Sequence, residues 1–233
     1  MAHGDRRTTT CYRCRMRCFY LHGFASGPTS SKGVAFAKDF AQHGVLVERL
    51  DLRVPSLAHL RPSKIIEHTL AAIGDGGPVV LIGSSLGGLT AARVAARSPA
   101  VRALVLLAPA FGFIERWRQR LGDDAWQAWQ QRGWLDIHDH AEQRPARVDF
   151  GFAEDAFALD VIDGGAPPAV VPTWIAHGRG DDVVDIARSR AWVAAAPAGT
   201  ASLLELDDDH QLVSSLPVIM PQAWAFLAPH LAA

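Results

Sequence analysis

The chain alternates between short apolar segments and longer segments in which apolar residues recur every three or four positions. The short segments have the apolar, β-branched character of buried strands and lie at residues 17–21, 45–50, 79–83, 103–107, 173–176 and 203–206. The longer, helix-like segments lie at residues 31–43, 62–73, 86–97, 186–196 and 216–227. This alternation predicts a mostly parallel sheet of about six strands, with helices covering both of its faces.

One segment, residues 111–160, breaks the alternation because it has no clear strand pattern. An insertion of this length between two strands is too long for a turn and predicts a helical cap. Four tryptophans are concentrated in it, namely Trp117, Trp126, Trp129 and Trp134. Trp126 and Trp129 are three residues apart and so share a helix face. The tryptophans either line an acyl-binding pocket or pack the cap onto the body, and the pattern leaves both roles open.

Length and composition fit a single domain that carries this insertion. With 233 residues, of which 49% are hydrophobic, the chain can bury one sizeable core, and we place the domain at residues 17–233. A formal net charge of −1 provides no field that would attract a nucleic acid. No apolar stretch reaches the ~18 residues needed to span a bilayer, and there is no signal-peptide core. We therefore expect a cytoplasmic protein with no nucleic-acid partner and no membrane span.

The first residues, 1–16, differ from the rest, and we expect a flexible, basic leader there. All three cysteines lie in or beside it. Cys11, Cys14 and Cys18 form a C-x2-C-x3-C cluster that could supply thiolates to zinc. A structural zinc site normally has two ligand pairs separated by a longer loop, so we favour a leader without metal. Cys18 is then a small buried strand residue.

The segment at residues 81–88, LIGSSLGG, contains a candidate nucleophile. A Gly-x-Ser-x-Gly pattern between a strand and a helix is typical of the nucleophile elbow, a turn so sharp that the residues two before and two after the serine must lack bulk. Taking Ser85 as the nucleophile places Gly83 and Gly87 at these crowded positions. Taking Ser84 instead would place an isoleucine and a leucine there. The pattern therefore favours Ser85.

A serine nucleophile needs a base, and the base needs a carboxylate to orient it. In this arrangement the chain order is serine, acid, histidine, with the partners on loops after later strands. The loop after the strand at 173–176 offers Asp181 and Asp182 as acids. His210 follows the next strand and is the predicted base. His177 precedes both aspartates, and His230 lies in the C-terminal tail, so neither fits.

The oxygen of an attacked carbonyl gains negative charge, which two backbone N–H groups must stabilise. One predicted donor is the amide of Leu86, which follows the nucleophile. The other is the amide of Phe24, in the loop after the first strand, because Gly23 allows this loop to come close to the substrate. His22 is expected to brace the loop rather than to transfer protons.

At these positions the chain resembles the α/β-hydrolase superfamily, and within it a group of small bacterial serine esterases long catalogued as an uncharacterised family. Their first loop, H-G-F-x-S-x-P-x-S-x-K, is matched by His22, Gly23, Phe24, Ser26, Pro28, Ser30 and Lys32. Their elbow G-S-S-L-G-G is matched as well, and their acid loop G-D-x-V-x-D maps the catalytic aspartate onto Asp181. The resemblance implies an α/β-hydrolase fold and hydrolysis of carboxylic esters without metal or organic cofactor. The Trp-rich cap is longer than we expect in this group, and the cysteine leader has no counterpart there.

The leading hypothesis is a serine carboxylesterase that acts on a small-molecule acyl ester of short to medium chain length. Thioester hydrolysis, lactone opening and acyl transfer would use the same triad and stay open as alternatives. A different class of protein, one that binds ligands on this fold without catalysis, is a further alternative. The natural substrate and the oligomeric state are not specified by the sequence.

Overall fold

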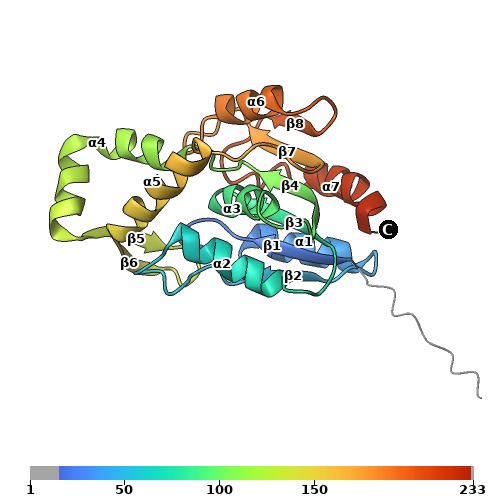
Figure 1. Cartoon of the computed structure of the whole chain (residues 1–233), viewed down its shortest axis with the longest axis horizontal. Helices are drawn as coiled ribbons and strands as arrows, with labels where there is room; N and C mark the ends of the chain where they lie inside the picture. The colour runs from blue at the N-terminus through green and yellow to red at the C-terminus, as the bar shows by residue number, and fades with distance from the viewer. Residues whose placement is uncertain (1–15, 232–233) are drawn as a thin grey trace, which may run out of the picture.

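The computed structural model describes residues 16–231 and contains a six-stranded, fully parallel sheet (Figure 1). In spatial order the strands are β2 (Val47–Leu50), β1 (Arg17–Leu21), β3 (Val79–Ser84), β4 (Val101–Leu107), β7 (Thr173–Gly178) and β8 (Ala201–Leu206). All six predicted strands are confirmed, with bounds that differ by up to two residues. The order reverses between β1 and β3, so the first loop and the β3–α3 turn lie side by side at one end of the sheet.

Helices cover both faces of the sheet, as predicted. On one face lie α1 (Ser31–Ala41) and α7 (Leu216–Leu231); on the other lie α2 (Pro62–Ile73), α3 (Leu86–Ala95) and α6 (Ile186–Ala195). The strands alternate between the two cores, since side chains of successive strand residues point to opposite faces. In β1, for example, Phe19 packs towards α2 and α3, whereas Tyr20 packs towards α1 and α7.

The cap consists of α4 (Phe113–Arg132), β5 (Trp134–Asp139), β6 (Arg144–Asp149) and α5 (Gly151–Asp163). It projects from one end of the body, at the left of Figure 1. The predicted cap has its two helices, but it also contains strands that were not predicted, because β5 and β6 form an antiparallel hairpin. Only Leu135, Ile137 and Val148 of this hairpin pack against the core, and charged residues separate them. A strand pair that buries so few side chains gives a weak alternating signal.

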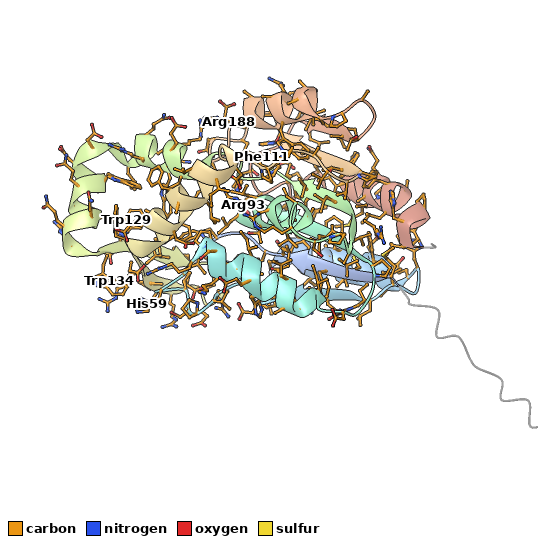
Figure 2. All side chains as sticks on the ribbon, in the orientation of Figure 1. His59, Arg93, Phe111, Trp129, Trp134 and Arg188 are labelled. Atoms are coloured by element: carbon orange, nitrogen blue, oxygen red, sulfur yellow. The ribbon has the colours of Figure 1, made fainter. Side chains whose placement is uncertain are left out.

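Buried charges, apolar packing and backbone hydrogen bonds hold the cap to the body. Arg93 of α3 is 1% exposed and forms ion pairs with Asp160 (2.6 Å) and Asp163 (2.7 Å) of α5. Figure 2 shows Arg93 between these two helices. At the hairpin turn, the amide of His140 donates to the carbonyl oxygen of Ala25 at 2.8 Å. The cap is therefore tied to both the central helix and the loop after β1.

The four cap tryptophans have different roles. Trp126 and Trp129 are buried with their rings 5.3 Å apart, and the Trp129 Nε1 donates to the carbonyl oxygen of Val148. Their shared helix face is confirmed, and they pack the interior of the cap. Trp117 lines a cavity beside Ser85, whereas Trp134 lies next to the guanidinium of Arg147. The packing role suggested by the sequence is thus confirmed for Trp126 and Trp129, whereas an acyl-binding role stays a prediction for Trp117.

The cysteine cluster is described only in part. Cys11 and Cys14 lie outside the described residues, as does the predicted leader up to residue 15. Cys18 is fully buried in β1, as expected for a small core residue, and burial raises the pKa of its thiol. Within residues 16–231, no helix is long and apolar enough to cross a bilayer.

Candidate active site

Ser85 lies in the turn between β3 and α3 with a backbone conformation that few side chains adopt. Its φ is 54° and its ψ is −118°, and its N–H donates to the carbonyl oxygen of Leu107 in β4. A Cβ at Gly83 would overlap Gly87, and a Cβ at Gly87 would overlap the carbonyl of Leu21. The steric argument that selected Ser85 from the sequence is therefore confirmed: both flanking positions accept only glycine.

The structure brings Ser85, His210 and Asp181 together in one hydrogen-bonded chain. The Nε2 of His210 lies 3.1 Å from Ser85 Oγ, although 125 residues separate them. On the other side of the ring, Nδ1 lies 2.7 Å from Asp181 Oδ2. This is the arrangement in which an imidazole can accept the serine proton while a carboxylate fixes its tautomer.

Asp181 and His210 meet because their loops follow β7 and β8, which are neighbours in the sheet. The two loops are also hydrogen-bonded to each other: Arg179 N–H donates to Leu206 O at 2.8 Å, and Gly180 N–H donates to Asp208 O at 3.0 Å. A Cβ at Gly178 would overlap the Asp208 carbonyl, so glycine permits this close approach. The acid and the base are therefore positioned by one rigid pair of loops.

The structure distinguishes the two candidate acids, Asp181 and Asp182, by where their side chains lie. Asp182 is exposed, and it is its backbone carbonyl that contacts the cap, through Arg116 and Arg120. The side chain of Asp181 is fully buried, and its Oδ1 accepts the amides of Val183 and Val184 at 2.8 Å each. Of the two, Asp181 is the one that reaches the imidazole of His210.

The environment of Asp181 keeps its carboxylate ionised. Burial alone would raise the pKa of this group, but hydrogen bonds from His177, His210 and the amide of Val184 outweigh burial and hold the pKa well below its usual range. A permanently charged carboxylate at this position favours the imidazolium that forms when His210 accepts a proton.

Sequence reasoning missed the contribution of His177, which it considered only as a possible base. His177 is completely buried at the end of β7, and its Nε2 lies 3.1 Å from Asp181 Oδ2. Its Nδ1 lies 2.8 Å from Ser189 Oγ. His177 is therefore a second donor to the carboxylate that orients His210. The available signal was its position at a strand end, four residues before Asp181.

His22 braces the first loop, as predicted. Its Nε2 accepts the amide of Leu52 at 3.0 Å, and its Nδ1 lies 2.8 Å from the carbonyl oxygen of Gly23. Burial lowers the pKa of this side chain. A neutral ring with Nδ1–H satisfies both contacts.

The predicted oxyanion donors border the same space as Ser85. Leu86 is the first residue of α3, so its N–H has no acceptor within the helix. The amide of Phe24 donates no hydrogen bond to any residue between 16 and 231. The loop after β1 can come close to Ser85 because residue 23 is a glycine; a Cβ there would lie 3.3 Å from Ser85 Cβ. The positive φ in this loop is at Ala25 (52°), so Gly23 contributes lack of bulk rather than an unusual backbone angle.

Two cavities meet at Ser85. One, of about 450 Å³, is largely apolar and extends under the cap between Phe24, Phe113, Trp117 and Leu121. The other, of about 590 Å³, is bordered by both Ser85 and His210 and has a more polar lining. Among the described residues, no group of three or more histidine, cysteine, aspartate or glutamate side chains could hold a metal ion.

Comparison with solved structures identifies the fold. The chain is similar to a putative hydrolase from Agrobacterium vitis S4, with 25% identity, a TM-score of 0.76, and coverage of 91% of this chain and 88% of that one. It is also similar to mouse alpha/beta hydrolase domain-containing protein 10 (20% identity, TM-score 0.74, coverage 91% and 89%). A third similar structure is Est1E from Butyrivibrio proteoclasticus with bound ferulic acid (21% identity, TM-score 0.76, coverage 94% and 90%). Comparison with curated proteins found no match.

The family comparison covers nearly the whole chain. A model described as "Uncharacterised protein family (UPF0227)" matches residues 17–228, which include every residue of the Ser85 site described above. The resemblance to α/β hydrolases that the motifs indicated is confirmed by the sheet, the helices and the similar structures. The chain has the α/β-hydrolase fold and belongs to the uncharacterised protein family UPF0227.

Proposed function

We propose that this protein is a serine hydrolase that cleaves carboxylic esters of short to medium acyl chain length. The observation that carries the proposal is the hydrogen-bonded chain from Ser85 through His210 to Asp181, at the meeting point of two cavities. Similar structures described as hydrolases and esterases support the same reaction class.

In the first half of the reaction, Ser85 Oγ attacks the ester carbonyl carbon while its proton passes to His210 Nε2. The carbonyl oxygen becomes an oxyanion, and the amides of Phe24 and Leu86 donate hydrogen bonds to it. The intermediate then collapses: the bond to the alcohol oxygen breaks, and His210 gives its proton to that oxygen. The alcohol leaves and the acyl group stays on Ser85.

In the second half, water replaces the alcohol. His210 accepts a proton from water, whose oxygen attacks the acyl carbon, and the same two amides stabilise the second oxyanion. When the bond to Ser85 Oγ breaks, His210 returns the proton to the serine. The product is a free carboxylic acid, and the enzyme is regenerated.

The apolar cavity supports an acyl chain as its occupant. Phe24, Phe113, Trp117 and Leu121 present apolar surface to it, and burial of an apolar chain there is favourable. Arg120 also borders this cavity. Because α4 encloses this cavity, the cap would select the length of the acyl chain.

The test combines covalent labelling with a substrate series. A fluorophosphonate should add one adduct to wild-type protein at Ser85, located by mass spectrometry of the peptide, and none to Ser85→Ala. Ser202→Ala, which removes an exposed serine on β8, is the matched control and should label fully. Activity on p-nitrophenyl esters of two to sixteen carbons should peak at short or medium chains. An unlabelled, inactive wild-type protein would contradict the proposal and favour a binding function.

A further inference from the structure

The second cavity beside Ser85 is built differently from the first and has no role in the proposed acyl binding. Ser85 borders both cavities, but His210 borders only the polar one and Leu86 only the apolar one. The oxygen of the departing alcohol must receive its proton from His210, so that oxygen has to lie on the His210 side. The acyl group stays on Ser85 and follows the apolar walls. The polar cavity is therefore the place for the alcohol part of the ester.

Two hydroxyl groups beside the polar cavity make no well-formed hydrogen bond. The side chain of Tyr20 is 1% exposed, and its hydroxyl lies next to those of Ser30 and Ser84, but neither it nor the hydroxyl of Ser30 makes a hydrogen bond of good geometry. Both residues border the cavity. A buried hydroxyl without a partner is unfavourable by about 1–3 kcal/mol, so such groups are rare unless a ligand or water satisfies them.

The location of Ser30 at the start of a helix adds to the observation on its hydroxyl. Ser30 is the N-cap of α1, where a serine side chain ordinarily accepts a hydrogen bond from the first turn of the helix. Here the side chain makes no such bond. A Cβ at Gly33 would lie 2.9 Å from the Tyr20 ring and 3.0 Å from Ser30 Oγ, so glycine allows the two groups to lie close together. The hydroxyls are thus gathered at the cavity rather than used to cap the helix.

A third polar group, the ammonium of Lys32, borders the same cavity. Its Nζ donates to the carbonyl oxygen of Gln211 at 2.8 Å, which leaves two further N–H donors. Burial lowers the pKa of Lys32 to about 8, although the carboxylates of Asp181, Asp209 and Asp208 oppose this shift. Three carboxylates around one ammonium disfavour an anion as ligand. Donors and acceptors together favour neutral hydroxyl groups.

We propose that the polar cavity binds an alcohol that carries additional hydroxyl groups, with Tyr20, Ser30 and Lys32 as its hydrogen-bond partners. The preferred substrates are then esters of neutral polyols rather than of simple alkyl alcohols. This inference rests on the proposed esterase function, because it names the leaving group of that same reaction.

A matched pair of esters tests the inference. Glyceryl 1-monobutyrate and n-propyl butyrate share the acyl group and a three-carbon alcohol, and differ by two hydroxyl groups. We expect kcat/KM to be about ten-fold higher for the glyceryl ester, which is the effect of one or two net hydrogen bonds. Tyr20→Phe and Ser30→Ala should each lower kcat/KM for the glyceryl ester several-fold and leave that for the propyl ester unchanged.

The controls separate recognition from folding. Thr69→Val removes a buried hydroxyl of α2 that bonds to Ile65 O, and it should leave the ratio of the two kcat/KM values unchanged. Tyr20→Phe should change Tm little, because the hydroxyl it removes makes no hydrogen bond of good geometry. A lower Tm with equal losses on both esters would show a structural role and overturn the proposal.

Two other outcomes would also overturn it. Hydrolysis of both butyrates at equal rates, unaffected by Tyr20→Phe and Ser30→Ala, would leave the esterase proposal standing and refute polyol recognition. A clear preference for butyryl glycerol phosphate over glyceryl monobutyrate would identify the site as an anion site. Absence of any hydrolysis, with no fluorophosphonate adduct, would refute the esterase function itself and polyol recognition with it.

Discussion

The sheet and the cap contribute different parts of the candidate site. The sheet positions its side chains, and the cap encloses the cavity beside them. The strands that position Ser85, Asp181 and His210 are buried on both faces or paired in register, so their ends have fixed positions. The cap packs its aromatic side chains into the same apolar core as one face of the body, for example Phe152 against Phe24, and adds polar contacts around this junction. The proposed reactive groups thus lie at the ends of the sheet strands, and the cap shapes the space beside them.

Ser85→Ala should cause the largest loss of activity while keeping the fold. We expect kcat to fall on the order of 10⁴-fold or more, because the nucleophile is lost while the oxyanion donors remain. Thermal unfolding should change little, because alanine keeps the Cβ of Ser85 and the same backbone conformation at this turn. Steady-state kinetics on a p-nitrophenyl ester together with calorimetry would check both. Retention of full activity would rule out Ser85 as the nucleophile.

A matched pair of aspartate variants tests the part of the site that the sheet positions. Asp181→Asn should lower kcat by roughly 10³-fold to 10⁴-fold, because the amide no longer holds the correct tautomer of His210. Asp182→Asn should stay within a few-fold of wild type, because its side chain is exposed. Kinetics of the two variants under one set of conditions is the measurement. Equal effects would reopen the choice of acid.

The attachment of the cap can be tested through two arginines labelled in Figure 2. Arg93→Met leaves Asp160 and Asp163 without their buried partner and should lower the free energy of unfolding by about 3–5 kcal/mol. Arg188→Met removes an exposed pair with Glu115 and should change it by less than about 1 kcal/mol. Urea denaturation measures both. Similar losses in the two variants would mean that the α3–α5 contact is not an anchor.

The role of the cap in shaping the acyl cavity predicts a smaller effect. Trp117→Ala should lower kcat/KM for medium-chain esters by roughly 2-fold to 10-fold, the worth of an aromatic contact, and affect acetate esters less. Trp134→Ala changes a hairpin tryptophan that contacts His59 and Arg147 and does not border this cavity, so it should alter neither. A chain-length profile for both variants checks this. An unchanged profile in Trp117→Ala would remove the cap from substrate selection.

The smallest predicted effect concerns pH. The pKa of Asp181 is lower in the folded protein than in the unfolded chain, so its ionised form stabilises the fold. This contribution is complete above the ordinary aspartate pKa of about 4 and is lost as pH falls from there towards the lower folded-state pKa. Unfolding free energies at pH 7 and pH 3 should therefore differ less for Asp181→Asn than for wild type. An equal difference would show that Asp181 is not the linked group.

The body could be predicted from the sequence because each of its features leaves a strong local signal. Fully buried strands such as β3 are continuous apolar runs, and the elbow requires two glycines at fixed distances from Ser85. The spacing of loops after successive strands also identified His210. At these positions the local sequence pattern and the overall fold favour the same residue types.

The remaining features depend on contacts that a linear pattern does not contain. Only three apolar side chains of the β5–β6 hairpin pack against the core, so charged residues obscure its alternation. The choice between Asp181 and Asp182 depends on which side chain points inward, and the residues alone left both candidates open. His177 was excluded as a base for sound reasons, yet its contact with Asp181 follows from the turn that brings the carboxylate back to the end of β7.

The hydrogen bond from the His140 amide to the Ala25 carbonyl has a consequence for protein engineering. The tip of the cap is bonded to the same short loop that holds the Phe24 amide, so exchanging the whole cap between relatives would also move this proposed oxyanion donor. Chimeras that retain residues 138–142 with the recipient body would keep this hydrogen bond, and they would allow acyl preference to be varied without displacing the proposed catalytic residues.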